Sequence, residues 1–328
     1  MKISIIGSGT WGIALGNLLA KKRDQVTMFC HFEEERKRYD TTRLHPRFPG
    51  IKIDKSIKFT GDLQESLDNA EMVVYATPSP YFRNTVKQSY PYLKGNPILV
   101  TVSKGLEDES FLTMSEILEE ETLNQFKVVC LTGPTHAEEV MERLPTCCVA
   151  CGHDKNAREK VREVFSNTFF RVYTNDDIYG SEISAALKNI IALASGMAEG
   201  LGYGDNARAA LITRGLYEIQ KLGVKLGAKP STFYGLAGLG DLVVTATSKH
   251  SRNHEAGLYL GQGYSVEETK ARVGMAIEGL NALKAAYHLS LKTKTEMPIT
   301  QAIYKIIYEG LPPSEAVNHL FGRSLKNE

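Results

Sequence analysis

The stretch that decides the fold is KISIIGSGTWG, residues 2–12. A short β-rich run is followed at once by Gly7, Gly9 and Gly12, which open a helical stretch. The GxGxxG spacing is common by chance, but its place between a strand and a helix is typical of a dinucleotide-binding turn. In such a turn the first glycine permits the bend, the second admits a pyrophosphate, and the third lets helix and strand pack closely. A glycine-rich turn without a ligand is the alternative.

Strand and helix signals alternate through the first half of the chain. The expected strands are KISII (2–6), VTMFC (26–30), MVVYAT (72–77), PILVTV (97–102), KVVCL (127–131), TCCVAC (146–151) and FFRVYT (169–174). This alternation predicts a mostly parallel, doubly wound sheet with helices on both faces.

From about Asp177 the strand signals almost vanish. Long helices are expected instead, at 180–199, 206–226, 276–290 and 297–308. The length of 328 residues also favours two domains. The sequence therefore predicts an α/β chain with a Rossmann-type dinucleotide-binding domain at 1–178 and an all-α substrate and catalytic domain at 179–328.

Composition excludes several classes of protein. The chain is 42% hydrophobic and 23% charged, which is typical of a globular protein. Its formal net charge of +1 provides no field that would attract nucleic acid or a membrane surface. No apolar run approaches the roughly 20 residues of a membrane span, and the N-terminus lacks a signal-peptide pattern.

The five cysteines are an odd number without the spacing of a disulfide framework. They indicate free thiols in a reducing compartment, so we expect a cytoplasmic protein. A metal site through Cys148, Cys151 and His153 is the alternative. A spacing of three along a strand puts the two cysteines on opposite faces, and we expect no metal.

The end of the second strand bears on the choice of dinucleotide. NAD-specific sites usually carry Asp or Glu there, about 20 residues after the glycines. Here Cys30 and His31 occupy that place, and Glu33–Glu35 and Arg36–Arg38 follow slightly later. We expect no carboxylate where it would repel a 2′-phosphate, so the sequence permits NADP and leaves NAD open. The single tryptophan, Trp11, is either ordinary core or a wall of the cofactor site.

Lys188 is the only ionisable residue between Ile183 and Ala198. Helical spacing gives this segment an apolar stripe, and the face that carries Lys188 holds only small residues: Ser181, Ser184, Ala185, Ala192 and Ser195. A helix without polar faces is usually buried, so we expect this ammonium to meet an anion or a polar substrate. A lysine that snorkels to the surface is the alternative.

Three further stretches carry polar side chains suited to a ligand. SKGLE (103–107) puts Lys104 at the end of a strand, where open α/β sheets bind ligands. GLAGLGDLVVTAT (235–247) carries Asp241 between a glycine-rich turn and an apolar run. HSRNH (250–254) gathers donors that suit a phosphate: Ser251, Arg252 and Asn253. Taken alone, each stretch also fits an ordinary loop.

In order along the chain, these motifs resemble those of the NAD(P)-dependent glycerol-3-phosphate dehydrogenases. The matching motifs are GSGTWG, SKGLE, GPTHAEEV (133–140), AALKNIIALASGMAEGLGYGDNARAALITRG (185–215), GLGDL, SRN and AIEG (276–279). The resemblance covers essentially the whole chain. It implies reversible reduction of dihydroxyacetone phosphate to sn-glycerol 3-phosphate with NAD(P)H. The glycerol 3-phosphate formed would supply phospholipid synthesis. It also implies a homodimer and a second domain of the 6-phosphogluconate dehydrogenase C-terminal-like kind.

The resemblance further implies a role for individual residues. The catalytic residues would be Lys188, as proton donor to the carbonyl oxygen, with Lys104 and Asp241. The substrate site would consist of Lys104, Gly133, Thr135, Lys188, Asp241, Ser251, Arg252 and Asn253. The dinucleotide would contact Gly7, Gly9, Thr10, Trp11, Gly12, His31, Lys104, Ala137, Arg252, Ala276 and Glu278. His31 and Ala276 depart from the residues frequent in the family, Arg and Val, and both departures concern the cofactor.

Two other classes of function remain. One is a related two-domain reductase acting on a carboxylate, such as a ketopantoate-type or 3-hydroxy-acid enzyme. The other is a non-catalytic NAD(P)-sensing module. The presence of Lys104, Lys188 and Asp241 argues against the sensor, because a sensor needs only the first domain.

Overall fold

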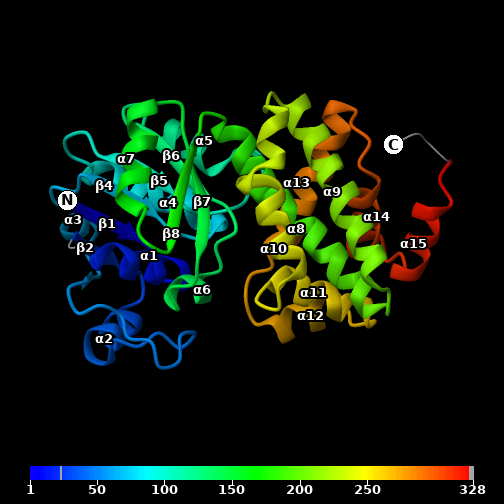
Figure 1. The fold of residues 1–328 in the computed structure, drawn as a ribbon, viewed down its shortest axis with the longest axis horizontal. Coiled ribbons are helices and arrows are strands. Elements are labelled where there is room, and N and C mark those ends of the chain that lie inside the picture. The colour runs from blue at the N-terminus through cyan, green and yellow to red at the C-terminus, as the bar shows by residue number, and fades with distance from the viewer. Residues whose placement is uncertain (23, 325–328) are drawn as a thin grey trace. The chain divides into compact units, whose positions relative to one another are not determined.

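The computed structural model describes residues 1–22 and 24–324 (Figure 1). The chain forms two compact units: unit 1 consists of Met1–Glu107 and Leu112–Glu182, and unit 2 of Asp108–Phe111 and Ile183–Glu328. The division after Glu182 falls inside helix α8 (Ile178–Gly200), slightly beyond the boundary expected between 178 and 179.

Unit 1 is built on one eight-stranded sheet in the order β3-β2-β1-β4-β5-β6-β7-β8. The strands are β1 (Lys2–Ile6), β2 (Gln25–Phe29), β3 (Lys58–Thr60), β4 (Met72–Tyr75), β5 (Ile98–Thr101), β6 (Val128–Thr132), β7 (Thr146–Cys151) and β8 (Phe170–Asn175). All neighbouring strands pair in parallel except β6 and β7, which are antiparallel. The predicted mostly parallel, doubly wound sheet is confirmed. The glycine turn follows β1, where the strand order reverses, and ligands bind at such switch points.

The helices of unit 1 lie between successive strands and cover the sheet (Figure 1). They are α1 (Thr10–Ala20), α2 (Glu33–Thr42), α3 (Leu63–Leu67), α4 (Ser79–Ser89), α5 (Met114–Glu121), α6 (Ala137–Met141) and α7 (Lys155–Phe165). Helix α1 is buried along almost its whole length and packs on the sheet through Ile13 and Leu15. The turn that precedes it is therefore held rigidly between β1 and the core.

Unit 2 contains helices and no strand among its described residues. Most of α8 belongs to it, followed by α9 (Asp205–Lys225), α10 (Asp241–Thr247), α11 (Arg252–Gly261), α12 (Val266–Val273), α13 (Glu278–Thr293), α14 (Pro298–Glu309) and α15 (Pro313–Phe321). Every residue of α8 from Ile183 to Ala198 is buried. The helix is therefore covered on all sides, as its lack of a polar face predicted. No helix in the described ranges is long and apolar enough to cross a bilayer.

Glycines bring α8 and α11 into backbone contact. A Cβ added to Gly196 would lie 2.0 Å from the carbonyl oxygen of His254, and one added to Gly257 would lie 2.1 Å from that of Leu193. Only hydrogen atoms fit at these two places, so the helices cannot separate or slide without losing the contact. This packing fixes the start of α11 against the middle of α8, where Lys188 lies.

Candidate active site

The turn between β1 and α1 uses its three glycines in different ways. Gly7 has φ of +119°, which side chains rarely allow, and a Cβ on Gly12 would lie 2.2 Å from the carbonyl oxygen of Gly7. Gly9 has an ordinary φ of −69°, and a Cβ there would meet nothing within 4 Å. Gly7 and Gly12 therefore serve the turn itself. Gly9 leaves open space at the N-terminus of α1, which fits an approaching pyrophosphate.

The other residues expected to contact the dinucleotide from unit 1 lie around the same sheet edge. Thr10 and Trp11 form the first turn of α1, and Trp11 is half-buried against the core. His31 is exposed and lies two residues after the end of β2, and Ala137 is the first residue of α6.

One carboxylate lies nearer to the glycine turn than its place in the sequence indicated. The sequence suggested that no carboxylate lies at the ribose end of the turn, because Glu33–Glu35 come after the strand has ended. The first turn of α2 leads the chain back, and the Ser8 hydroxyl donates to Oε2 of Glu35 at 2.8 Å. Ser8 stands between Gly7 and Gly9, so a carboxylate does lie against the glycine turn.

Lys104, Gly133 and Thr135 meet at the carboxyl ends of two neighbouring strands. Lys104 follows β5 and Gly133 follows β6. The Lys104 ammonium donates to the carbonyl oxygen of Gly133 at 3.0 Å, and the Thr135 hydroxyl donates to the same oxygen at 3.0 Å. Three residues expected at the substrate site thus gather where open α/β sheets bind ligands.

In unit 2, the ammonium of Lys188 is held by two oxygen atoms. It donates to Oδ1 of Asp241 and to the hydroxyl of Thr245, the latter at 2.7 Å. The Thr245 hydroxyl in turn donates to the backbone carbonyl of Asp241 at 2.7 Å. All three side chains are buried, Lys188 with 4% of its surface exposed. Lys188 therefore does not snorkel to the surface, and its charge is balanced inside the unit.

Thr245 is a site residue that the sequence reading missed. It follows Asp241 by four positions on α10, so both side chains lie on one face of that helix. The threonine lies in an apolar run, LVVTAT, in which it resembles an ordinary β-branched core residue. The signal available in the sequence was the four-residue spacing between Asp241 and Thr245.

The three donors of the SRN motif lie at the start of α11. The Ser251 hydroxyl caps this helix, accepting from the backbone N–H of His254 at 3.2 Å. The Arg252 guanidinium is half-buried and donates to the carbonyl oxygen of Ala276 at 3.4 Å. Arg252 thus contacts one further residue that was expected at the dinucleotide.

Asn253 belongs to a chain of hydrogen bonds in which the donor and the acceptor of each bond are fixed. Its Oδ1 accepts from the backbone N–H of Gly279 at 2.8 Å, and its Nδ2 donates to Oδ1 of Asn189 at 3.0 Å. Nδ2 of Asn189 then donates to the Glu278 carboxylate at 3.3 Å. A backbone N–H can only donate and a carboxylate can only accept, so the ends fix both amides. One amide hydrogen of Asn253 remains for another acceptor. Asn189 was also missed, although it is the amide next to Lys188 in the buried helix.

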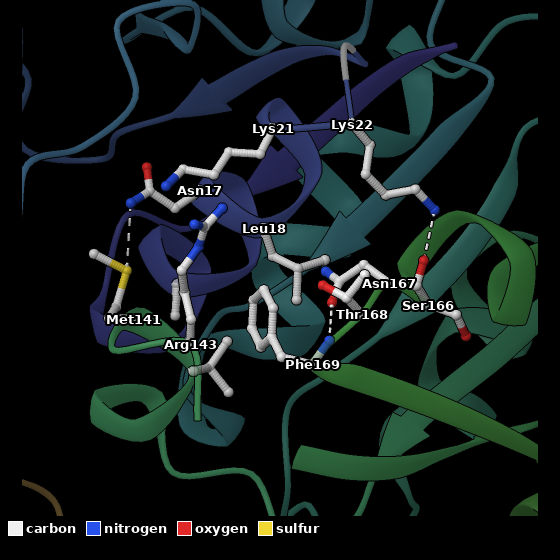
Figure 2. A pocket seen from close by; sticks show the side chains of 12 residues that line it. Asn17, Leu18, Lys21, Lys22, Met141, Arg143, Ser166, Asn167, Thr168 and Phe169 are labelled. Atoms are coloured by element: carbon white, nitrogen blue, oxygen red, sulfur yellow. Dashed lines mark hydrogen bonds between the residues drawn. The ribbon is translucent and has the colours of Figure 1, made fainter. Parts of the chain in front are cut away.

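A hollow of about 290 Å³ lies elsewhere on unit 1 (Figure 2). It is lined by the second half of α1, the end of α6 and the chain before β8. At its rim the Lys22 ammonium donates to the carbonyl oxygen of Ser166 at 2.8 Å, and the Asn17 amide donates to the sulfur of Met141 at 3.5 Å. None of the residues expected at the site lines this hollow, so it is separate from the glycine turn.

Two of the five cysteines adjoin expected site residues: Cys148 lies against Gly133, and Cys30 immediately precedes His31. All five are free thiols, and burial raises the pKa of Cys30 to about 11 and that of Cys151 to about 12. Neither is a thiolate at neutral pH. In the part of the chain that the structure describes, no cluster of His, Cys, Asp and Glu side chains is placed to hold a metal ion.

Two family models match the chain, one in each half of its sequence. Residues 2–158 match the family described as NAD-dependent glycerol-3-phosphate dehydrogenase N-terminus, and residues 177–318 match the corresponding C-terminus. The chain belongs to the NAD-dependent glycerol-3-phosphate dehydrogenase family. The glycerol-3-phosphate dehydrogenase (NAD(P)+) of Carboxydothermus hydrogenoformans is 46% identical over 100% of this chain and 98% of its own length. That of Bacillus subtilis is 44% identical over 100% of this chain and 96% of its own.

Solved structures of glycerol-3-phosphate dehydrogenases extend the likeness to the fold. The enzyme from Coxiella burnetii superposes with a TM-score of 0.93 at 35% identity, covering 98% of this chain and 99% of that one. A ketopantoate reductase from Ralstonia eutropha reaches a TM-score of 0.65 at 14% identity, with 97% of this chain and 100% of that one covered. That likeness extends to the fold alone. The ketopantoate-type alternative therefore has no support beyond shared architecture.

Proposed function

We propose that the protein reduces dihydroxyacetone phosphate to sn-glycerol 3-phosphate with NAD(P)H, and that it catalyses the reverse reaction. The observation that carries the proposal is the buried Lys188, held by Asp241 and Thr245 in a chain whose full-length relatives bear this activity in their names. The supply of glycerol 3-phosphate for phospholipid synthesis, a homodimer and a cytoplasmic location belong to the same proposal and are supported by the family resemblance.

The glycine turn fits a dinucleotide, because Gly9 offers open space beside a helix N-terminus. When bound, the nicotinamide supplies the hydride that reduces the ketone carbon. The residues of this chain that would hold the dinucleotide are Gly7, Gly9, Thr10, Trp11, Gly12, His31, Lys104, Ala137, Arg252, Ala276 and Glu278.

Lys188 would supply the proton. Negative charge develops on the carbonyl oxygen of the substrate during reduction, and a cation with a transferable proton stabilises it. Lys188 gives its proton to this oxygen and becomes a neutral amine, and water restores the proton afterwards. Asp241 and Thr245 keep the nitrogen in one place throughout, since both accept from it in a buried setting. Lys104 would add positive charge.

The phosphate of the substrate would be bound by Ser251, Arg252 and Asn253. Arg252 offers a planar pair of donors that suits phosphate oxygens. The remaining amide hydrogen of Asn253 provides a further donor with a fixed direction. Binding of this remote group orients the ketone for reaction.

Substitution of Arg252 tests this assignment. Arg252→Ala should lower kcat/KM for dihydroxyacetone phosphate by roughly 10- to 150-fold, because a charge-assisted hydrogen bond contributes about 1.5–3 kcal/mol. The effect should shrink sharply with unphosphorylated dihydroxyacetone. Arg272→Ala, which removes an arginine stacked on Tyr264 in the same unit, serves as the control. An equal loss of kcat/KM on both substrates, at unchanged NAD(P)H affinity, would mean that another residue binds the phosphate.

A further inference from the structure

The SKGLE segment, which carries Lys104, is fixed to its surroundings on both sides of that lysine. Before Lys104, the Ser103 hydroxyl donates to the carbonyl oxygen of Thr77 at 2.5 Å. After it, Gly105 has φ of +141°, and a Cβ added there would lie 2.8 Å from Oγ of Ser79, the first residue of α4. The backbone next to Lys104 therefore lies directly against the N-terminus of α4.

Arg83 holds the far end of this segment. Its Nε donates to Oε1 of Glu107 at 2.7 Å and its Nη2 donates to Oε2 at 2.8 Å, so the planar guanidinium binds both oxygens of one carboxylate. Arg83 follows Ser79 by four positions on α4, so both residues lie on the same face of that helix. The side chains of Arg83 and Glu107 are 23% and 24% exposed, and water therefore screens this pair less than a pair on the open surface.

The other donors of Arg83 contact the last turn of α5. Its Nη1 donates to Glu121, and its Nη2 donates to Oε2 of Glu120 at 3.1 Å. At the opposite end of α5, Thr113 is the N-cap residue and forms an isolated antiparallel β-bridge with Leu106 of the SKGLE segment. One guanidinium thus connects α4, α5 and the SKGLE segment. A lysine could not make these contacts, because its ammonium has no planar pair of donors.

These contacts bear on Lys104 because the position of its backbone decides where its ammonium lies. The side chain is a flexible four-carbon chain, and its ammonium donates to the carbonyl oxygen of Gly133 at 3.0 Å. A displacement of about 1 Å in a reacting group can reduce the rate by about 100-fold. We propose that Arg83 is a positioning residue that holds Lys104 at the substrate through Glu107. The proposal rests on the function proposed above and adds to it a residue that acts through another.

A double-mutant cycle between Arg83 and Lys104 tests the proposal. Arg83→Met should lower kcat/KM for dihydroxyacetone phosphate by roughly 10- to 100-fold in the wild-type background, because the displaced ammonium no longer lies where negative charge develops. In a Lys104→Met background the same substitution should change kcat/KM by no more than about 2-fold, since no ammonium is left to position. Purely structural damage would lower kcat/KM by the same factor in both backgrounds.

Two further variants control for charge and for stability, and circular dichroism verifies the fold of each protein. Lys87→Met removes another cation of α4, which pairs with Glu121 at 3.6 Å, and should leave kcat/KM unchanged. Arg83→Lys keeps the positive charge among the carboxylates but cannot bind both oxygens of Glu107 in one plane. Its kcat/KM should fall by roughly 10-fold. If Arg83→Met does not fold, the same cycle is measured with Arg83→Lys.

Several results would overturn the proposal. An equal loss of kcat/KM in the two backgrounds would contradict it, and so would wild-type kcat/KM in Arg83→Lys. A loss in Lys87→Met as large as that in Arg83→Met would assign the effect to the charge of α4 in general. Wild-type kcat/KM in Lys104→Met would leave Arg83 no lysine to position. Absence of dihydroxyacetone phosphate reduction by the wild type would contradict the proposed function as well, whereas an active wild type with an additive cycle would contradict this inference alone.

Discussion

The ammonium of Lys188 donates to the carboxylate of Asp241, and the two side chains are only 4% and 1% exposed. Removing two charges from water is expensive, and a well-packed apolar pair would usually be at least as stable. The pair is therefore better explained by chemistry than by stability. A proton donor that must remain in one place, next to a ketone oxygen, requires a partner of this kind.

Lys188→Ala should reduce kcat by roughly 10²- to 10⁴-fold, the usual range for a general acid. NAD(P)H binding should persist, because the glycine turn belongs to unit 1. Steady-state turnover and fluorescence titration of NAD(P)H measure the two effects. Turnover near that of the wild type would remove Lys188 from the mechanism.

The same substitution leaves Asp241 buried without its partner, which costs about 3–5 kcal/mol of stability. Combining it with Asp241→Asn removes that charge as well. The double variant should recover most of the stability lost in Lys188→Ala and none of the activity. Denaturant unfolding and turnover of both variants separate a catalytic role of Lys188 from a structural one. Recovered activity would point to the structural role.

Gly9 and Gly12 should respond differently to substitution. Gly9→Val fills the space open to a pyrophosphate and should abolish dinucleotide binding while the melting temperature stays near that of the wild type. Gly12→Ala places a Cβ 2.2 Å from the carbonyl oxygen of Gly7 and should destabilise unit 1 itself. Thermal unfolding and NADH titration distinguish the two effects. Undiminished NADH affinity in Gly9→Val would mean that the turn holds no ligand.

Asn189 should act by orienting Asn253. Asn189→Asp sets a second carboxylate against Glu278 and should raise KM for dihydroxyacetone phosphate by roughly 10-fold, since a lost or reversed hydrogen bond costs about 1–3 kcal/mol. Adding Glu278→Gln supplies an amide that donates to the new carboxylate. It should bring KM most of the way back to the wild-type value. Saturating NADH removes any effect of Glu278 on cofactor affinity. If KM stayed high in the double variant, Asn189 would contribute only to packing and would not orient Asn253.

Glu218 makes stability depend on pH. Burial raises its pKa from an ordinary value of 4.5 to about 7, although the backbone N–H groups of Ile299 and Thr300 donate to it at 2.7 and 3.2 Å. A carboxyl whose pKa is raised by folding stabilises the protein below its unfolded pKa, and this stabilisation is lost as the pH rises through 7.

The interval between the two pKa values corresponds to about 3 kcal/mol. The free energy of unfolding of the wild type, relative to that of Glu218→Gln, should therefore fall by about that amount between pH 4 and pH 8. Urea titrations of both proteins at each pH provide the comparison. Glu182, whose pKa burial also raises to about 7, is common to both proteins and cancels. A difference that stays constant with pH would contradict the assignment to Glu218.

The regular elements that could be predicted are those with strong local signals. Apolar β-branched runs identified strands such as MVVYAT and TCCVAC, and long low-polarity stretches identified α8, α9, α13 and α14. Strand β3 was missed because KFT is three residues long, and its pairing is decided by β2. The shorter helices α10, α11, α12 and α15 are ten residues or fewer, too short for periodicity to stand out.

The site was predictable where one residue stands out from its surroundings, as Lys188 does among apolar neighbours. Its partner Asp241 lies 53 positions away, and only the packing of α10 on α8 brings Thr245 to the same nitrogen. Glu35 is a residue whose position could not be predicted from the sequence. Its distance along the chain from the glycines suggested separation, but the direction in which α2 leaves β2 returns it to Ser8. Linear spacing does not encode that direction.

The central claim is most directly tested by following the oxidation of NADH and NADPH by the purified protein, each with and without dihydroxyacetone phosphate. Oxidation of at least one dinucleotide should require dihydroxyacetone phosphate and produce glycerol 3-phosphate in equal amount. Absence of dihydroxyacetone phosphate-dependent oxidation with either dinucleotide, or faster oxidation with ketopantoate in its place, would contradict the account.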